Sequence, residues 1–177
     1  MAFLRIKKIK GKEYAYMVEN EWKPTAKSIG TLRDVKLRGS RQKVKGYIGR
    51  IHRFSLTNNI DFQQFMKITN VENYINSNDK NKIISDLAEW ELFKFGVSKE
   101  EFSIAPSIAI VKKSKKNVAL HINNGFMCNL TMKNLLEIEP TGDEQHDGYL
   151  LARAFVEAGI KVPEEIFVGV FGKLYKN

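Results

Sequence analysis

The first stretch of the chain alternates between apolar and polar residues with a period of two. Residues 3–10 (FLRIKKIK) end at Gly11, and within residues 14–22 (YAYMVENEW) the aromatic side chains and a valine fall on one parity. Successive side chains of a strand point to opposite faces, so this pattern is typical of half-buried strands. We therefore expect a β-hairpin that turns at residues 10–12.

A third strand is expected after an interruption. Pro24 breaks the alternation, and residues 23–40 form either a long basic loop or a second small hairpin. The alternation resumes at Arg41, which shares its parity with Lys43 and Lys45. The side-chain period of a strand then predicts that these three cations lie on one outer face.

Beyond Phe54 the pattern becomes helical. Short helical segments are expected at residues 61–68 and 71–76, followed by a stronger helix over residues 79–95. This longer helix carries a broad apolar face, so it is expected to lie in the core. Gly96 directly follows it, which suits a C-terminal stop.

Two apolar and β-branched stretches, residues 107–111 and 118–122, flank four lysines. This arrangement predicts a second β-hairpin with a basic tip. The lysines of the tip either extend a surface that binds polyanions or keep the end of the hairpin soluble.

Three helices are expected to complete the chain. The first spans residues 129–138 with Asn129 as its N-cap, and the second spans residues 142–158 and ends before Gly159. The third has Pro163 in its first turn. It carries an apolar stripe made of Ile166, Phe167, Val170, Phe171 and Leu174.

These elements predict an α+β protein in which a small N-terminal antiparallel β module (residues 1–54) is followed by an α+β body (residues 55–177). The body would contain the second hairpin and a helical C-terminal part. An apolar content of 43% in 177 residues is enough for a real core. Cys128 is the single cysteine, which favours a reducing, cytoplasmic location, and no membrane-spanning segment is expected.

The positive charge of the chain is concentrated at its front. Residues 1–54 hold 15 lysines and arginines against 4 acidic residues, whereas residues 55–177 hold 14 against 16. A field of one sign concentrated in less than a third of a chain attracts polyanions, because bound phosphates release their counterions. The alternative is a basic face that only keeps the protein soluble.

We therefore predict nucleic-acid binding through this basic β module and the tip of the second hairpin. Two aromatic residues lie among the cations, and either one can stack on a base or pack inside the sheet. Packing is favoured for Trp22, whereas both interpretations stay open for Tyr47. The candidate binding residues are Lys7, Lys8, Lys10, Lys12, Arg38, Arg41, Lys43, Lys45, Tyr47, Arg50, Arg53, Lys112, Lys113, Lys115 and Lys116.

The front of the chain resembles a known module. The run FLRIKKIKGKEYAYMVENEW followed by SRQKVKGYIGR is similar to the amino-terminal module of insertion-sequence transposases of the IS4 and IS1634 type, and of small archaeal proteins that share it. The resemblance covers about a quarter of the chain and implies contact with polynucleotides. The residues that match the "RQK…YLG" strand of the module are Arg41, Gln42, Lys43, Tyr47, Ile48 and Gly49.

Catalysis is the minority interpretation. The resembling transposases hold two metal ions with three carboxylates on a ribonuclease-H-like fold, and this chain lacks the long β/α series of that fold. Asp143, Glu144 and Asp147 lie near His146, but acidic residues at a helix start also stabilise the helix. We expect neither a metal nor a cofactor, and Cys128 is expected to be a small core residue.

The predicted function is therefore non-enzymatic nucleic-acid binding with a slight preference for RNA or the ribosome, because no recognition helix carries the cations. The alternative is a metal-dependent nuclease or a degenerate transposase-derived DNA-binding protein that uses the acidic cluster. The final apolar stripe either mediates homodimerisation or completes the core of its own chain.

Overall fold

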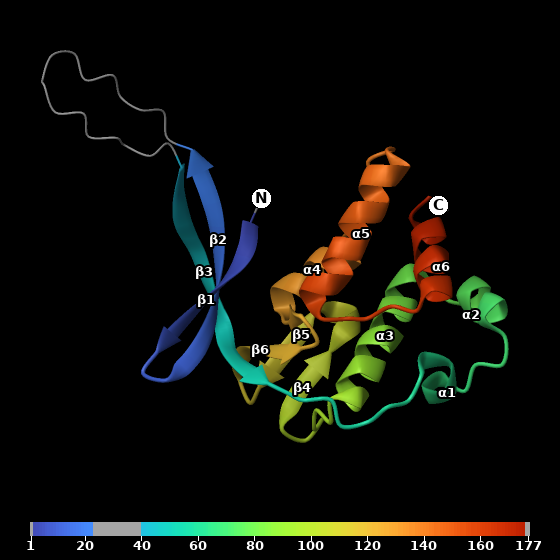
Figure 1. The fold of residues 1–177 in the computed structure, drawn as a ribbon, viewed down its shortest axis with the longest axis horizontal. Helices are drawn as coiled ribbons and strands as arrows, with labels where there is room; N and C mark the ends of the chain where they lie inside the picture. The colour runs from blue at the N-terminus through green and yellow to red at the C-terminus, as the bar shows by residue number, and fades with distance from the viewer. Residues whose placement is uncertain (1, 23–39, 176–177) are drawn as a thin grey trace, which may run out of the picture.

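The computed structural model describes residues 2–22 and 40–175, and within them the strands join in one seven-stranded sheet. The strands are Ala2–Ile9 (β1), Lys12–Trp22 (β2), Ser40–Arg53 (β3), Phe102–Ala105 (β4), Ile110–Lys113 (β5), Lys116–Ile122 (β6) and Gly125–Met127 (β7). Their order in the sheet is β1-β2-β3-β6-β5-β4, and β7 also pairs with β6. Figure 1 shows the first three strands on one side of the molecule and the helices on the other.

The predicted first hairpin is confirmed. β1 and β2 pair antiparallel from Ala2 with Glu19 to Ile9 with Lys12. Lys10 and Gly11 between them both have a positive φ, at 49° and 77°. A two-residue turn with positive φ matches the right-handed twist of the strands it joins. The long loop or second small hairpin expected at residues 23–40 cannot be compared with the structure, because residues 23–39 lie outside the described residues.

β3 is the strand that connects the front of the chain to its body. Its first part pairs antiparallel with β2, and its last four residues, from Arg50 to Arg53, pair parallel with residues 118–121 of β6. Gly49 allows this close approach, because a Cβ there would lie 2.7 Å from the Val118 Cα. The boundary expected at residue 54 follows the end of this shared strand and stays a prediction.

The helices are close to those expected from the sequence. They are Phe62–Met66 (α1), Val71–Ser77 (α2), Lys80–Lys94 (α3), Asn129–Leu136 (α4), Glu144–Ala158 (α5) and Glu164–Leu174 (α6). The Asp79 side chain caps α3 by accepting from the Lys82 amide, at 2.7 Å. These six helices and the strands together confirm the α+β class.

Three details differ from the expectation. The predicted strand at residues 107–111 is shorter, because Pro106–Ile108 forms a 3₁₀ turn (η1) and β5 starts only at Ile110. The short strands β4 and β7 were not expected. Asn129 is not the cap of α4: Cys128 holds that position, and the Asn129 side chain instead accepts a hydrogen bond from the Val111 amide at 2.8 Å.

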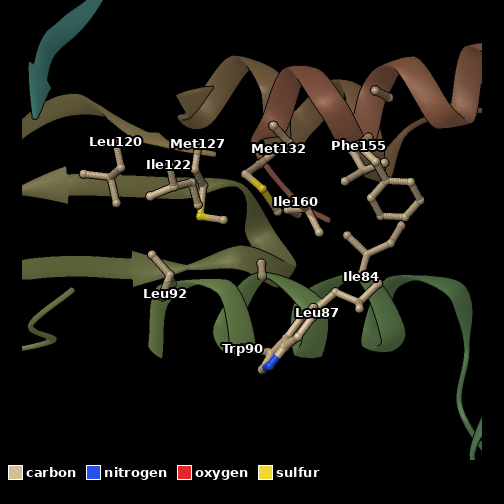
Figure 2. Packing of buried hydrophobic residues seen from close by; sticks show 14 of the residues in the cluster. Ile84, Leu87, Trp90, Leu92, Leu120, Ile122, Met127, Met132, Phe155 and Ile160 are labelled. Carbon is tan, nitrogen blue, oxygen red and sulfur yellow. The ribbon is translucent and has the colours of Figure 1, made fainter. Parts of the chain in front are cut away.

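A large core lies between the sheet and the helices. Figure 2 shows Ile84 and Leu87 of α3 on one side and Met132 of α4 and Phe155 of α5 on the other. Each of these side chains is buried, and full burial of such a side chain contributes about 2 kcal/mol.

The apolar stripe of α6 belongs to this same core. Ile166, Val170 and Leu174 are buried in it, and Phe167 and Phe171 pack against its edge. The structure thus favours the interpretation in which the stripe completes the core of its own chain over the one in which it forms a dimer interface.

A smaller cluster joins the front strands to the body. Ala15 of β2, Ile48 and Ile51 of β3, and Ala119 of β6 are buried together with Cys128, which precedes α4. Cys128 is therefore a core residue, as expected, and its burial raises the pKa of the thiol.

Candidate nucleic-acid interface

On one face of the front strands, the Tyr47 ring packs against two other tyrosine rings, those of Tyr14 and Tyr16, and we call these three residues the tyrosine cluster. Tyr14 and Tyr16 lie two residues apart on β2 and thus on one face, and Tyr47 of β3 pairs with Tyr16 in the register. The Tyr47 ring lies 5.5 Å from Tyr16 and 6.3 Å from Tyr14, centroid to centroid. Tyr47 is 57% exposed, so one ring of this tyrosine cluster is largely open to solvent.

Cations surround the tyrosine cluster. The Lys7 ammonium lies 5.2 Å from the centroid of the Tyr16 ring, and Lys7 pairs with Tyr14 in the β1–β2 register. Arg50 also pairs with Tyr14, from the other side of β2. Within residues 2–22 and 40–175, neither Lys7 nor Arg50 has a carboxylate within salt-bridge distance. Their charges are thus available to an anion.

A hollow of about 320 Å³ opens beside the tyrosine cluster, and we call it the junction hollow. It lies where β3 changes partner, since Arg50 pairs with Tyr14 of β2 on one side and with Val118 of β6 on the other. Its lining combines aromatic rings, cations and an amide: Tyr14, Tyr47, Arg50, His52, Lys113, Lys116, Asn117 and Val118.

His52 is held as a neutral imidazole in the junction hollow. Burial lowers its pKa, and the positive charges of Lys113 and Arg50 lower the pKa further, against a smaller opposite effect of Glu101. Its ring packs edge-on against Phe102 at 5.2 Å. The lowered pKa thus leaves His52 without a charge of its own at neutral pH.

The Tyr47 hydroxyl stays protonated at neutral pH. Partial burial raises its pKa, and the neighbouring Tyr14 and Tyr16 phenols raise it further. The exposed ring thus combines a neutral apolar face with a hydroxyl that donates and accepts hydrogen bonds.

The structure brings only part of the predicted binding set together. Lys7, Tyr47, Arg50, Lys113 and Lys116 lie around the tyrosine cluster and the junction hollow. Lys113 also pairs with Glu101 and lies 5.0 Å from the Phe102 centroid, so its charge is partly used.

Other predicted cations lie elsewhere or are neutralised. Arg53 forms two hydrogen bonds with Glu13, at 2.7 and 3.1 Å, and Lys45 pairs with Glu19 at 2.7 Å. The carboxylate beside each of these two cations offsets its positive charge at short range. Lys8 and Lys12 line another hollow near the first turn, together with Arg50, Arg53 and Glu13. The remaining predicted cations are dispersed: Lys10 lies in the first turn, Lys43 is exposed on β3, and Lys112 and Lys115 lie at the second hairpin.

The side chains of Arg38, Arg41 and Trp22 lie outside what the structure describes. Tyr14 and Tyr16 were not predicted as site residues, because their shared parity was interpreted only as the signal of a half-buried strand. Lys7 could have identified the face of the hairpin that is open to a ligand. It lies directly across the hairpin from Tyr14, so a cation and the two tyrosines share that face.

The acidic residues at the start of α5 have structural roles. Asp143 caps the helix by accepting from the His146 amide at 3.1 Å. Asp147 is only 2% exposed and accepts from the Thr141 amide and hydroxyl, the Gly142 amide and the Tyr175 hydroxyl, at distances of 2.6 to 3.2 Å. Hydrogen bonds from Thr141 and Tyr175 lower the pKa of Asp147.

This acidic cluster was the basis of the nuclease alternative. Among the described residues, no group of three or more histidine, cysteine or acidic side chains is arranged to hold a metal ion. The carboxylate of Asp147 is instead used by its own chain, which favours the capping interpretation for the cluster.

A second hollow, of about 230 Å³, separates β1 from α4 and α5. Its walls include Leu4, Ile6, Phe126, Leu130 and Val156, so it is largely apolar and provides no cation for a phosphate. In the described ranges, none of the helices has the length and apolarity needed to cross a bilayer. The junction hollow and the tyrosine cluster together are the strongest candidate for a site.

Comparison with known proteins adds no relative from which a function could be transferred: no protein-family model, curated protein or solved structure matches this chain.

Proposed function

We propose that this protein binds nucleic acid, with a preference for RNA, through the tyrosine cluster and the cations around it, and that it does so without catalysing a reaction. One observation supports this proposal most strongly: contacting tyrosine rings, one of them 57% exposed, lie between cations that have no acidic partner among the described residues. Stacking of a base on an aromatic ring contributes about 1–3 kcal/mol, and each neutralised phosphate adds a salt-dependent contribution.

RNA is the favoured ligand because the site is a sheet face rather than a helix. The predicted cations that gather here come from β1, β3 and the β5–β6 hairpin. A helix that enters the major groove would instead have to present them from one helical face. Irregular RNA exposes unstacked bases that an aromatic sheet face can contact. The ribosome and its RNA are partners of this kind, and the buried free thiol of Cys128 suits the reducing cytoplasm.

The test is a salt titration of the affinity for labelled RNA and DNA. Between 50 and 200 mM salt, log affinity is expected to fall linearly with log salt, with a slope of about −0.7 per phosphate neutralised on a single strand. An affinity that stays unchanged over this range for both nucleic acids would contradict the proposal.

Two variants and a control locate the interface. Lys7→Gln and Arg50→Gln remove cations beside the tyrosine cluster, whereas Lys133→Gln removes an exposed cation on α4 that pairs with Glu137 at 3.8 Å. The first two are expected to weaken binding and to flatten the salt slope, and the third to leave both unchanged.

Labelled RNA and DNA are expected to stay intact with magnesium or manganese, and cleavage abolished by Asp147→Ala would favour the nuclease alternative.

A further inference from the structure

We infer that the junction hollow binds one unpaired nucleotide, with its base against Tyr47 and its phosphate between Arg50 and Lys116, so that the protein selects single strands over duplexes. This inference rests on the proposed function and names the class of nucleic acid that the same site would bind.

The size and shape of the hollow suit a single nucleotide. Its volume of about 320 Å³ lies at the lower end of the roughly 300–1,000 Å³ of ligand pockets. Tyr14 and Tyr47 of the tyrosine cluster belong to its lining, as do Lys116, Asn117 and Val118 at the start of β6. One base with its phosphate fits such a space, whereas a stretch of duplex does not.

The chemistry of the lining matches the parts of a nucleotide. The exposed Tyr47 ring offers a face for a base, and Arg50 and Lys116 offer cations with no acidic partner among the described residues. The Asn117 amide can donate to and accept from the edge of a base. An aromatic face, two cations and an amide around one hollow are the complementary groups for a base and its phosphate.

The need for an exposed base face produces the selectivity. In a duplex both faces of each base are stacked and the pairing edge is occupied, so a base reaches Tyr47 only after it flips out, which costs a few kcal/mol. An unpaired strand avoids this cost. Phosphate contacts with Lys7 and the other surface cations still attract a duplex, but without the contribution of the base.

The experiment measures the affinity of the protein for one labelled ten-nucleotide RNA strand by fluorescence anisotropy. The strand is tested alone and annealed to its complement, at the same salt concentration. The strand alone is expected to bind at least about tenfold tighter than the duplex. Tyr47→Ala is expected to remove most of this difference by weakening the single strand about tenfold, while duplex affinity changes less than about twofold. Tyr47→Phe keeps the ring and is expected to bind like the wild type.

A second measurement does not depend on Tyr47. Uridine monophosphate, titrated into the ¹⁵N-labelled protein, is expected to shift the amide signals of Arg50 and Asn117, and inorganic phosphate to shift them less. The amide signal of Lys133, which lies on α4, is the control for effects outside the hollow. Should Tyr47→Ala fail to fold, this titration and the wild-type comparison of strand and duplex still decide the question.

The outcomes separate the inference from the proposed function. Equal affinities for strand and duplex, both falling with salt, overturn the inference and leave nucleic-acid binding in place. Shifts with uridine monophosphate that are confined to residues outside the junction hollow also overturn it. The absence of salt-dependent binding to either form overturns the proposed function and the inference together.

Discussion

The tyrosine cluster with its cations and the acidic residues at the start of α5 differ in how far their own chain provides them with partners. At α5 the Asp147 carboxylate is buried and accepts hydrogen bonds from Thr141, Gly142 and Tyr175. At the sheet, Tyr47 is exposed and Arg50 has no acidic partner among the described residues. We infer that the partners of a charged residue, more than its type, distinguish a residue that stabilises the fold from a candidate for ligand binding.

The largest expected effect comes from the backbone that supports the tyrosine cluster. Gly49→Ala would place a Cβ 2.7 Å from the Val118 Cα and closer still to the Asn117 carbonyl. We expect the free energy of unfolding to fall by about 3 kcal/mol, because backbone atoms cannot give way, and RNA binding to be lost with it. Denaturant unfolding measures the change.

Gly172→Ala is the control for this substitution. Gly172 lies in α6, and a Cβ added there would meet no atom within 4 Å, so alanine is expected to leave stability unchanged or to raise it by about 0.5–1 kcal/mol. A Gly49→Ala protein as stable as the wild type would mean that β3 and β6 lie further apart than described.

The next prediction tests the structural side of the comparison. Asp147→Ala leaves the Thr141 and Gly142 amides and the Tyr175 hydroxyl without their acceptor. The melting temperature is expected to fall by several degrees, while RNA affinity at a temperature where the protein is folded stays within about twofold. Weaker RNA binding by a folded Asp147→Ala protein would show that the acidic cluster is part of the site.

The low pKa of Asp147 gives this prediction a pH dependence. Because the folded-state pKa lies below the ordinary aspartate value of 3.8, the carboxylate stabilises the fold above that value and loses this effect as pH falls through the lower folded pKa. The wild type is therefore expected to lose stability faster than Asp147→Asn between about pH 4 and pH 2, as thermal unfolding can measure.

A comparison of two arginines sharpens the functional side. Arg50 lines the junction hollow with no acidic partner in the described ranges, whereas Arg53 forms hydrogen bonds with Glu13. Arg50→Gln is expected to lower RNA affinity about three- to tenfold at low salt and to reduce the salt slope by about 0.7. Arg53→Gln is expected to change affinity less than about twofold, and equal effects of the two substitutions would remove the distinction between paired and unpaired cations.

The smallest expected effect concerns His52. Its pKa is lowered by burial, by Lys113 and by Arg50, with Glu101 acting in the opposite direction, so the ring is neutral at pH 7. A bound phosphate adds negative charge and raises the pKa, so binding takes up protons and RNA affinity is expected to rise about two- to threefold from pH 7 to pH 5.5. His52→Gln is expected to reduce this pH dependence, and an affinity that falls on acidification would contradict the placement of phosphate near His52.

The sequence predicted most of the longer elements, but not the short strands β4 and β7 or the arrangement of the site. Period-two alternation located β1, β2 and β3, and Asp79 and Gly96 marked the ends of α3, because these signals are local. The partner exchange at Arg50 depends on β6, which no local pattern reveals. The net charge located the candidate binding region at the front of the chain. It could not separate Arg50 from Arg53, because their difference lies in the contact of Arg53 with Glu13, which is distant in the sequence.

The parallel pairing of β3 with β6 also has a consequence for the order of folding. It joins residues about seventy positions apart, whereas the β1–β2 hairpin closes over a two-residue turn. Local hairpins form within microseconds, but distant pairing must overcome the entropy of a long loop and therefore comes later. During synthesis the tyrosines of β2 and β3 would leave the ribosome well before Lys116 and Asn117. The nascent chain would thus present its basic strands first and acquire the junction hollow only once β6 has been made.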